Sequence, residues 1–347
     1  MPVARRPHAV TAVLRAVLRA VVPLVAALGV QLLGACDPGD DPAPPDGAAT
    51  GAPTAGPSIS PGVTAVPSAA PAPAPPPEIA PGTEDYLDVD GRPVRLVVPA
   101  SYDPAAPAPL VLLLHGYGSD AAEVDAALGL RAEVERRGVL YVLADGTPDD
   151  EGRRFWDATE ACCNFFGPPV DDARYLADVL RTVAASYAVD PGHVAVVGHS
   201  NGGFMAYRMA CEHAELVTAV VSLAGAMTAT ADDCAPSRPV SVLQVHGTAD
   251  STVRYDGGST GPFPYPSATD SVDAWARLDG CGAEPATRAG ALDVEESLPG
   301  PETSVTTYGG CRDGARVALW TVEGAEHVPD LAPGFAAAML DAALGAG

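Results

Sequence analysis

From Gly82 onward, short apolar runs alternate with amphipathic stretches along the chain. The runs are rich in valine and leucine and end at polar or turn residues, which is typical of strands buried on both faces. The intervening stretches space their apolar residues three and four apart, as helices do. The pattern predicts strands at 95–99, 110–114, 139–143, 194–197, 217–223, 240–245 and 317–322, and helices at 120–137, 171–187, 204–211, 268–278 and 335–344.

This repeated β-α order predicts an α/β fold with a mostly parallel central sheet and helices on both of its faces. Residues 83–347 are enough for one domain of this kind. In such sheets the functional groups collect at the carboxyl ends of the strands. The residues that follow each predicted strand are therefore the first candidates for a site.

The most informative stretch is Gly198-His-Ser-Asn-Gly202, which lies between the apolar run 194–197 and a helical segment that begins near Phe204. A G-x-S-x-G pattern occurs often by chance, but strand, tight turn and helix are the context of a nucleophile elbow. The pattern predicts that Ser200 lies in a strained turn with its hydroxyl above the sheet. The backbone N–H of Asn201, at the helix N-terminus, would face a developing oxyanion.

Two further strand ends supply partners for this serine. His246-Gly-Thr-Ala-Asp250 follows the run 240–245, and Glu323-Gly-Ala-Glu-His327 follows the run 317–322. Nucleophile, acid and histidine then occur in the chain order of α/β-hydrolases. In such a triad His327 would take the proton of Ser200, and Asp250 would orient the imidazole and stabilise its charged form.

Other histidines and acids compete for these roles. His115 and His246 lie at strand ends and suit structural roles. His199 lies within the elbow and faces away from the point of attack. His193 and His213 suit the surface. The alternative acids are Asp256, Asp145 and Asp233.

The turn His115-Gly-Tyr-Gly118 follows the apolar run 110–114. It can direct the backbone N–H of Tyr117 to the same point as that of Asn201, and two such donors make an oxyanion hole. The triad needs no cofactor, and neither the cysteine nor the histidine spacing predicts a metal site.

Four aromatic residues precede the helix expected at 171–187. Phe155, Trp156, Phe165 and Phe166 form either an acyl or aryl pocket near the active face or the packing of their own loop. The sequence leaves both interpretations open.

The N-terminal residues 1–35 have the composition of a lipoprotein signal peptide. Arginines precede an apolar stretch at 21–33, and small residues lead directly to Cys36. A plain secretory signal and a retained anchor are the alternatives. A lipidated Cys36 would hold the mature protein on a bacterial membrane surface. Residues 36–82 are rich in proline and alanine and predict a disordered linker.

Charge and cysteine content narrow the partners and the compartment. The formal net charge of −24 argues against nucleic acid as a partner. Beyond Cys36 there are six cysteines, an even number that suits disulfides in an exported chain. Cys211 with Cys234 and Cys281 with Cys311 would close short local loops. Cys162 and Cys163 could bond each other, bond other partners or stay reduced.

The segments 198–208, 246–250, 170–172 and 275–281 together resemble the exported polyhydroxybutyrate-depolymerase-like and feruloyl-esterase-like α/β-hydrolases, which overlap with carbohydrate esterases that act on acetyl or feruloyl groups of xylan. The resemblance covers about residues 83–345. It implies hydrolysis of a small or oligomeric carboxylic ester by Ser200, Asp250 and His327, and the pairing of Cys281 with Cys311 is similar to the family's pattern.

The resemblance has one departure and leaves two other functions open. Residues 324–329 lack the family's glycine-rich run before the histidine and its aromatic residue after it. The resemblance therefore predicts the reaction better than it predicts the substrate. The catalytic domain reaches the chain's end without a polymer-gripping domain, so we expect soluble esters or oligomers. A serine peptidase of the same fold and a catalytically silent, surface-anchored binding protein are the alternatives.

Overall fold

The computed structural model describes residues 79–165, 167–282 and 284–345. The predicted signal peptide, Cys36 and nearly all of the predicted linker lie outside the described residues. Ile79 is buried, and its backbone N–H donates to the Tyr187 hydroxyl at 2.9 Å. Within the described ranges, no helix has both the length and the apolar character needed to cross a membrane.

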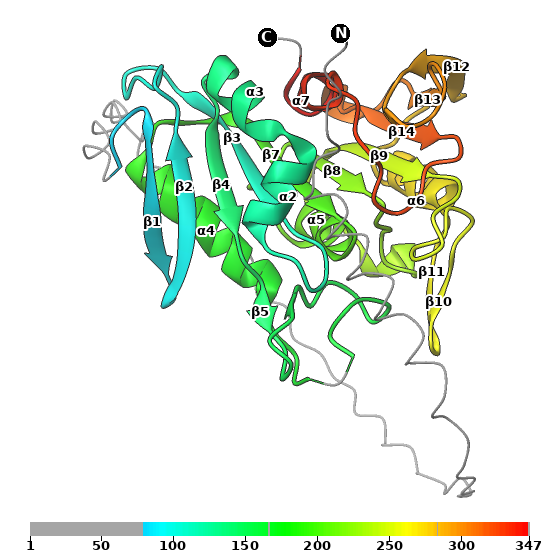
Figure 1. Ribbon diagram of the computed structural model, residues 1–347, viewed down its shortest axis with the longest axis horizontal. Coiled ribbons are helices and arrows are strands. Elements are labelled where there is room, and N and C mark those ends of the chain that lie inside the picture. The colour runs from blue at the N-terminus through cyan, green and yellow to red at the C-terminus, as the bar shows by residue number, and fades with distance from the viewer. Residues whose placement is uncertain (1–78, 166, 283, 346–347) are drawn as a thin grey trace, which may run out of the picture. The chain divides into compact units, whose positions relative to one another are not determined.

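One ten-stranded sheet forms the centre of the described part (Figure 1). The six central strands run parallel, in the order β4, β3, β7, β8, β9 and β14, and antiparallel strands extend both edges. From edge to edge the strands are β1 (Thr83–Val89), β2 (Arg92–Val98), β4 (Leu140–Ala144), β3 (Ala108–Leu114), β7 (Val189–His199), β8 (Ala219–Leu223), β9 (Ser241–Gly247), β14 (Val317–Val322), β13 (Thr303–Tyr308) and β12 (Ala286–Leu292).

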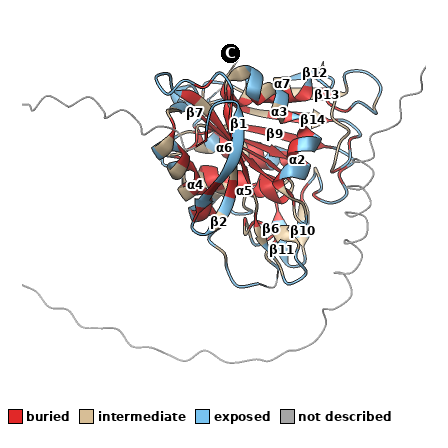
Figure 2. Ribbon diagram, turned by 60° about the vertical axis from the view of Figure 1, so that its left-hand side comes forward, coloured by how far each residue is buried: buried red, intermediate tan, exposed pale blue. Residues whose placement is uncertain are grey.

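Helices pack on both faces of this sheet, because successive side chains of a buried strand point to opposite faces. In β3, Leu110, Leu112 and Leu114 enter one core, and Val111 and Leu113 enter the other. Figure 2 shows the central strands almost entirely buried. The first core is closed by α4 (Asp172–Ser186), α5 (Asn201–Glu212) and α6 (Ala268–Leu278), and the second by α2 (Ala121–Leu128), α3 (Leu130–Arg137) and α7 (Phe335–Leu344).

The predicted fold class is confirmed, and the element boundaries differ in instructive places. The single helix expected at 120–137 is two helices, because Gly129 adopts φ +64° and ends α2 there. Asp120 is the N-cap, and its carboxylate accepts from the Glu123 N–H. The apolar pattern did not predict the edge strands β1 and β12 or strand β13, which lies between β14 and β12. It also did not predict the small pairs β5 (Thr147–Pro148) with β6 (Arg154–Phe155) and β10 (Gly258–Thr260) with β11 (Phe263–Tyr265).

Three disulfides are present in the described residues. Cys211 is bonded to Cys234 and Cys281 to Cys311, as expected from their short separations. Cys162 is bonded to Cys163, which is the first of the three alternatives for this pair.

Candidate active site

Ser200 lies at the junction of β7 and α5, in a backbone conformation that side chains rarely adopt. Its φ is +54° and its ψ is −118°. A Cβ at Gly198 would lie 2.0 Å from the carbonyl oxygen of Gly202, and one at Gly202 would lie 2.4 Å from that of Leu114. Only glycine permits such close approach of strand and helix, so the elbow predicted from G-x-S-x-G is present with the serine at its apex.

A continuous chain of hydrogen bonds joins Ser200, His327 and Asp250. The Ser200 Oγ lies 2.8 Å from His327 Nε2, and His327 Nδ1 lies 2.7 Å from Asp250 Oδ2. His327 and Asp250 are buried, whereas Ser200 is half-buried. The three side chains come from the ends of β7, β14 and β9, as their positions after predicted strands indicate. The arrangement can deprotonate a serine hydroxyl as it attacks a carbonyl carbon.

Four N–H groups face the carboxylate of Asp250. Its Oδ1 accepts from the backbone N–H groups of Thr252 at 2.8 Å and Val253 at 2.9 Å. Its Oδ2 faces His327 and also His246, whose Nε2 is 3.3 Å away. Burial alone would raise the pKa of Asp250, but the hydrogen bonds from both imidazoles outweigh it and hold that pKa well below its usual range. The carboxylate therefore stays ionised.

The competing histidines have other partners. His199 Nε2 donates to the backbone carbonyl of His327 at 3.0 Å, and burial lowers the His199 pKa to about 4. His115 bonds only backbone groups of its own surroundings, while His193 and His213 lie beside acids near the surface. Among the competing acids, Asp145 accepts from the N–H of Ala121, and Asp233 and Asp256 are exposed.

The two segments expected to supply the oxyanion-hole N–H groups both adjoin Ser200. Asn201 begins α5 directly after Ser200. A Cβ at Gly116, the residue before Tyr117, would lie 3.3 Å from the Cβ of Ser200. Among the described residues, neither the Tyr117 nor the Asn201 N–H has a protein acceptor, so both are available to a ligand.

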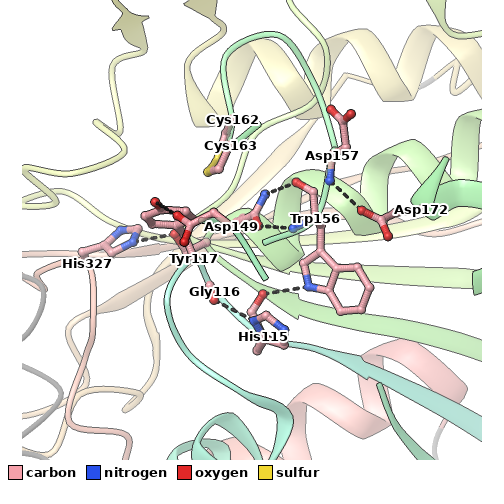
Figure 3. Close-up of a disulfide and its surroundings, with 12 residues drawn as sticks. His115, Gly116, Tyr117, Asp149, Trp156, Asp157, Cys162, Cys163, Asp172 and His327 are labelled. Atoms are coloured by element: carbon pink, nitrogen blue, oxygen red, sulfur yellow. Dashed lines mark hydrogen bonds between the residues drawn. A yellow bond between two sulfur atoms is a disulfide. The ribbon is translucent and has the colours of Figure 1, made fainter. Parts of the chain in front are cut away.

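The aromatic loop after β6 divides between core and surface. Phe155 and Trp156 are buried within the first core. Phe165 is 39% exposed, and its ring meets the edge of the Tyr117 ring at 6.3 Å between centroids. Phe166 lies outside the described residues. The loop also carries the Cys162–Cys163 disulfide, which Figure 3 shows in one view with Tyr117 and His327.

Two residues at this site were not assigned a role by sequence reasoning. Trp156 forms hydrogen bonds with the side chain of Asn201 in the elbow and with the backbone carbonyl of His115 in the turn after β3. Asp172, part of the resembling segment 170–172, is fully buried and accepts from the N–H of Asp157 at 2.8 Å. For both residues the sequence offers only the residue type as an indication of a role. Their hydrogen-bond partners are distant in sequence, so no local pattern identifies them.

A cavity of about 340 Å³ with mixed polar and apolar walls lies beside α5. Its walls are residues 158–161, Arg208 and Glu212 of α5, and residues 228–230 after β8. No triad residue lines it. In the described part of the chain, no group of three or more His, Cys, Asp or Glu side chains is placed to hold a metal ion.

Comparison with known proteins shows the family to which the chain belongs. A family model described as "Putative esterase" matches residues 90–288. The "Putative esterase NocK" of Nocardia uniformis subsp. tsuyamanensis is 31% identical over 246 residues, which cover 65% of this chain and 67% of that protein. "Feruloyl esterase B" of Piromyces equi is 24% identical over 68% of this chain, and the match spans only 42% of that protein.

Among solved structures, "Acetyl xylan esterase from Aspergillus awamori" superposes with a TM-score of 0.52 at 17% identity, covering 72% of this chain and 95% of that one. This likeness concerns the fold. Together with the family match over more than half of the chain, it accords with the elbow, the strand order and the helices on both faces. The chain belongs to the esterase family and is a carboxylic-ester hydrolase with the α/β-hydrolase fold.

Proposed function

We propose that this esterase works through an acyl-enzyme on Ser200, with His327 as general base and acid and Asp250 as its orienting partner. The observation that carries the proposal is the unbroken hydrogen-bonded series from Ser200 Oγ through the imidazole to the Asp250 carboxylate. A serine hydroxyl is a weak nucleophile until a neighbouring base removes its proton. The strained elbow holds that hydroxyl at the carboxyl edge of the sheet.

In the acylation step the Ser200 Oγ bonds to the ester carbonyl carbon while its proton passes to His327 Nε2. The carbonyl oxygen becomes an oxyanion that accepts from the Tyr117 and Asn201 N–H groups. The bond from carbon to the alcohol oxygen then breaks, and the imidazolium gives its proton to that oxygen. Asp250 stabilises the imidazolium between these transfers.

Deacylation repeats the sequence with water. Water gives a proton to His327 Nε2 as its oxygen bonds to the acyl carbon, and the same two N–H groups hold the second oxyanion. The bond from carbon to Ser200 Oγ breaks, and the imidazolium returns its proton to the serine. The carboxylic acid leaves, and no further cofactor is needed to balance the reaction.

For substrates we propose short-chain, hydroxybutyrate-oligomer, feruloyl or acetyl esters. The support comes from similar proteins, which include feruloyl esterases from Piromyces equi, Neurospora crassa and Emericella nidulans at 24–26% identity. The half-exposed Phe165 against Tyr117 offers an aromatic surface near the nucleophile. Such a surface suits an apolar acyl group.

We further propose that the protein is exported and is held on a bacterial membrane surface through a lipid on Cys36. Three disulfides suit an oxidising compartment. The arginines, the apolar stretch and the small residues before Cys36 suit lipoprotein processing. Residues 36–82 would then separate the catalytic domain from the membrane.

The test is hydrolysis of a panel of esters by the full chain: 4-nitrophenyl acetate, butyrate and octanoate, methyl ferulate and a 3-hydroxybutyrate oligomer. Ser200→Ala should lower kcat by at least about a thousandfold without changing the melting temperature, because one half-exposed hydroxyl is lost. Ser259→Ala, at an exposed serine in β10, is the matched control and should retain activity. Turnover by Ser200→Ala near that of the parent would overturn the assignment.

A further inference from the structure

One buried residue, Trp156, connects the two segments that carry the N–H groups of the proposed oxyanion hole (Figure 3). Its backbone N–H donates to Asn201 Oδ1 at 2.7 Å, and its carbonyl accepts from Asn201 Nδ2 at 2.9 Å. Its indole Nε1–H donates to the carbonyl of His115 at 3.1 Å. Both the amide oxygen and the amide nitrogen of the Asn201 side chain are therefore bonded to Trp156. The backbone N–H of Asn201 is not part of these hydrogen bonds and can donate to a ligand.

The His115 ring fixes the direction of the other N–H group. The Gly146 N–H donates to His115 Nε2 at 2.9 Å, so the proton of the neutral ring is on Nδ1, which donates to the Gly116 carbonyl at 2.7 Å. The C=O and N–H of a trans peptide unit point in opposite directions. Holding the Gly116 carbonyl against the ring therefore turns the Tyr117 N–H away from it. Burial lowers the His115 pKa, which keeps the ring neutral as both bonds require.

Trp156 is in turn anchored to the body of the fold through the next residue. The Asp157 N–H donates to Asp172 Oδ2 at 2.8 Å, and Asp172 Oδ1 forms an ion pair with Arg92 of β2 at 3.2 Å. The Asp157 carbonyl accepts from Arg208 of α5. The segment is thus tied to β2, α4 and α5 as well as to the turn after β3, and it has little freedom to shift.

We propose that Trp156 is a positioning residue that holds the Tyr117 and Asn201 N–H groups at a fixed separation beside Ser200. This proposal rests on the proposed function. Donors that are already oriented need no reorganisation as the oxyanion forms, and the loss of one such donor costs a hundredfold to a thousandfold in kcat. Loosening the connection should therefore weaken stabilisation of the transition state more than binding of the planar ester.

The test uses two variants of the full chain. Trp156→Phe removes the indole N–H and keeps an aromatic ring, and Asn201→Ala releases the Trp156 backbone while keeping its own N–H. Trp275→Phe is the matched control, because Trp275 is equally buried and its Nε1 donates to the Val240 carbonyl at 2.7 Å away from the triad. For each protein we would measure kcat, KM, the melting temperature and the inhibition constant of phenylboronic acid, whose adduct with Ser200 is tetrahedral.

We expect kcat to fall about tenfold in Trp156→Phe and about a hundredfold in Asn201→Ala, with KM within about threefold of the parent. The inhibition constant of the boronic acid should rise by the same factors. Trp275→Phe should lower the melting temperature about as much as Trp156→Phe does. Its kcat and its binding of the boronic acid should equal those of the parent. Each variant can decide the matter if the other does not fold.

The proposal is overturned if Trp156→Phe and Asn201→Ala keep kcat and boronic acid binding within twofold of the parent. It is also overturned if Trp275→Phe reduces both to the same extent, since the effect would then follow stability alone. Failure of the proposed function has a different signature: the parent protein itself would show no turnover that depends on Ser200.

Discussion

At the scale of single residues, two imidazoles approach one oxygen of Asp250. His327 lies 2.7 Å from Oδ2 and His246 lies 3.3 Å from it. Gln244 Nε2 is 3.0 Å from His246 Nδ1 and can only donate, so the proton of His246 is on Nε2, which points at the Val253 carbonyl and at Asp250. The His246 N–H is thus shared between the Val253 carbonyl at 2.7 Å and the Asp250 carboxylate at 3.3 Å, and it orients the turn and the carboxylate together.

Replacing His246 should therefore reduce catalysis without removing any group of the triad. We expect His246→Phe to lower kcat/KM about tenfold, since a hydrogen bond to a charged group contributes about 1.5 kcal/mol or more. His246→Gln, which can still donate, should recover part of the loss. Steady-state kinetics on the best ester of the panel would measure both variants.

The matched control is His193, whose Nδ1 lies 2.7 Å from Asp190 in an exposed pair. His193→Gln should leave kcat/KM unchanged, because exposed pairs contribute little and this pair is not part of the triad's hydrogen-bond chain. Unaltered kinetics in His246→Phe would show that the two backbone donors suffice to orient Asp250.

The clustering of the three residues of the proposed triad could be predicted from sequence, because chain order and strand ends determine it. Ser200, Asp250 and His327 each follow an apolar run, and parallel strands bring their carboxyl ends to one edge. The roles of His246 and Trp156 could not be predicted in this way. Their partners depend on how the turns after β9 and β6 fold back, and no periodic pattern specifies that.

At the scale of elements, the C-terminus of α6 contains a buried acid. Asp279 is its C-cap, and Oδ1 accepts from the Val240 N–H at 3.3 Å, while Oδ2 has no partner among the described residues. Burial raises the Asp279 pKa to about 6. Since this folded pKa lies above the unfolded value, the stabilising contribution of the protonated form is complete below about pH 4 and is lost as the pH rises through about 6.

Asp279→Asn should therefore stabilise the protein at pH 8 and have little effect at pH 4. The amide keeps the acceptor for the Val240 N–H and removes the buried charge. For a pKa shift of this size, removing the charge should raise the free energy of unfolding at pH 8 by about 2 to 3 kcal/mol. Urea unfolding at the two pH values measures the difference. Asp270→Asn, at the exposed N-terminal end of the same helix, is the control and should give no such gain at pH 8. Equal midpoints for Asp279→Asn and the parent at pH 8 would contradict the prediction.

Elements were predictable where the apolar pattern was unambiguous. The expected bounds of α6, α7 and β14 agree with the structure, because each has a clear stripe or run and a polar flank. The edge strands β1 and β12, and β13 between β12 and β14, were not predicted, because they contain mostly polar, small or half-buried residues and lack an apolar run. The helix breaks at Gly129 because this residue adopts the left-handed backbone conformation. The apolar residues keep a helical spacing on both sides of it, so the sequence pattern does not show the break.

At the scale of the whole molecule, two disulfides close chain loops and one does not. Cys211–Cys234 and Cys281–Cys311 span 23 and 30 residues, whereas Cys162 and Cys163 are adjacent. A disulfide stabilises chiefly by restricting the unfolded chain, and loops of these lengths are worth about 3 kcal/mol each. An adjacent pair restricts almost no additional chain, so its contribution to global stability should be small.

We therefore expect Cys211→Ala with Cys234→Ala to lower the melting temperature by several degrees, and Cys162→Ala with Cys163→Ala to lower it much less. The comparison is matched because each double variant loses one disulfide, and all four cysteines pack against the same core. Thermal unfolding with and without reductant measures both effects. If the adjacent pair proved as important for stability as Cys211–Cys234, restriction of the unfolded chain would not be the main contribution. The disulfides would then act through packing in the folded state, and the loop that carries Trp156 would depend on the Cys162–Cys163 bond.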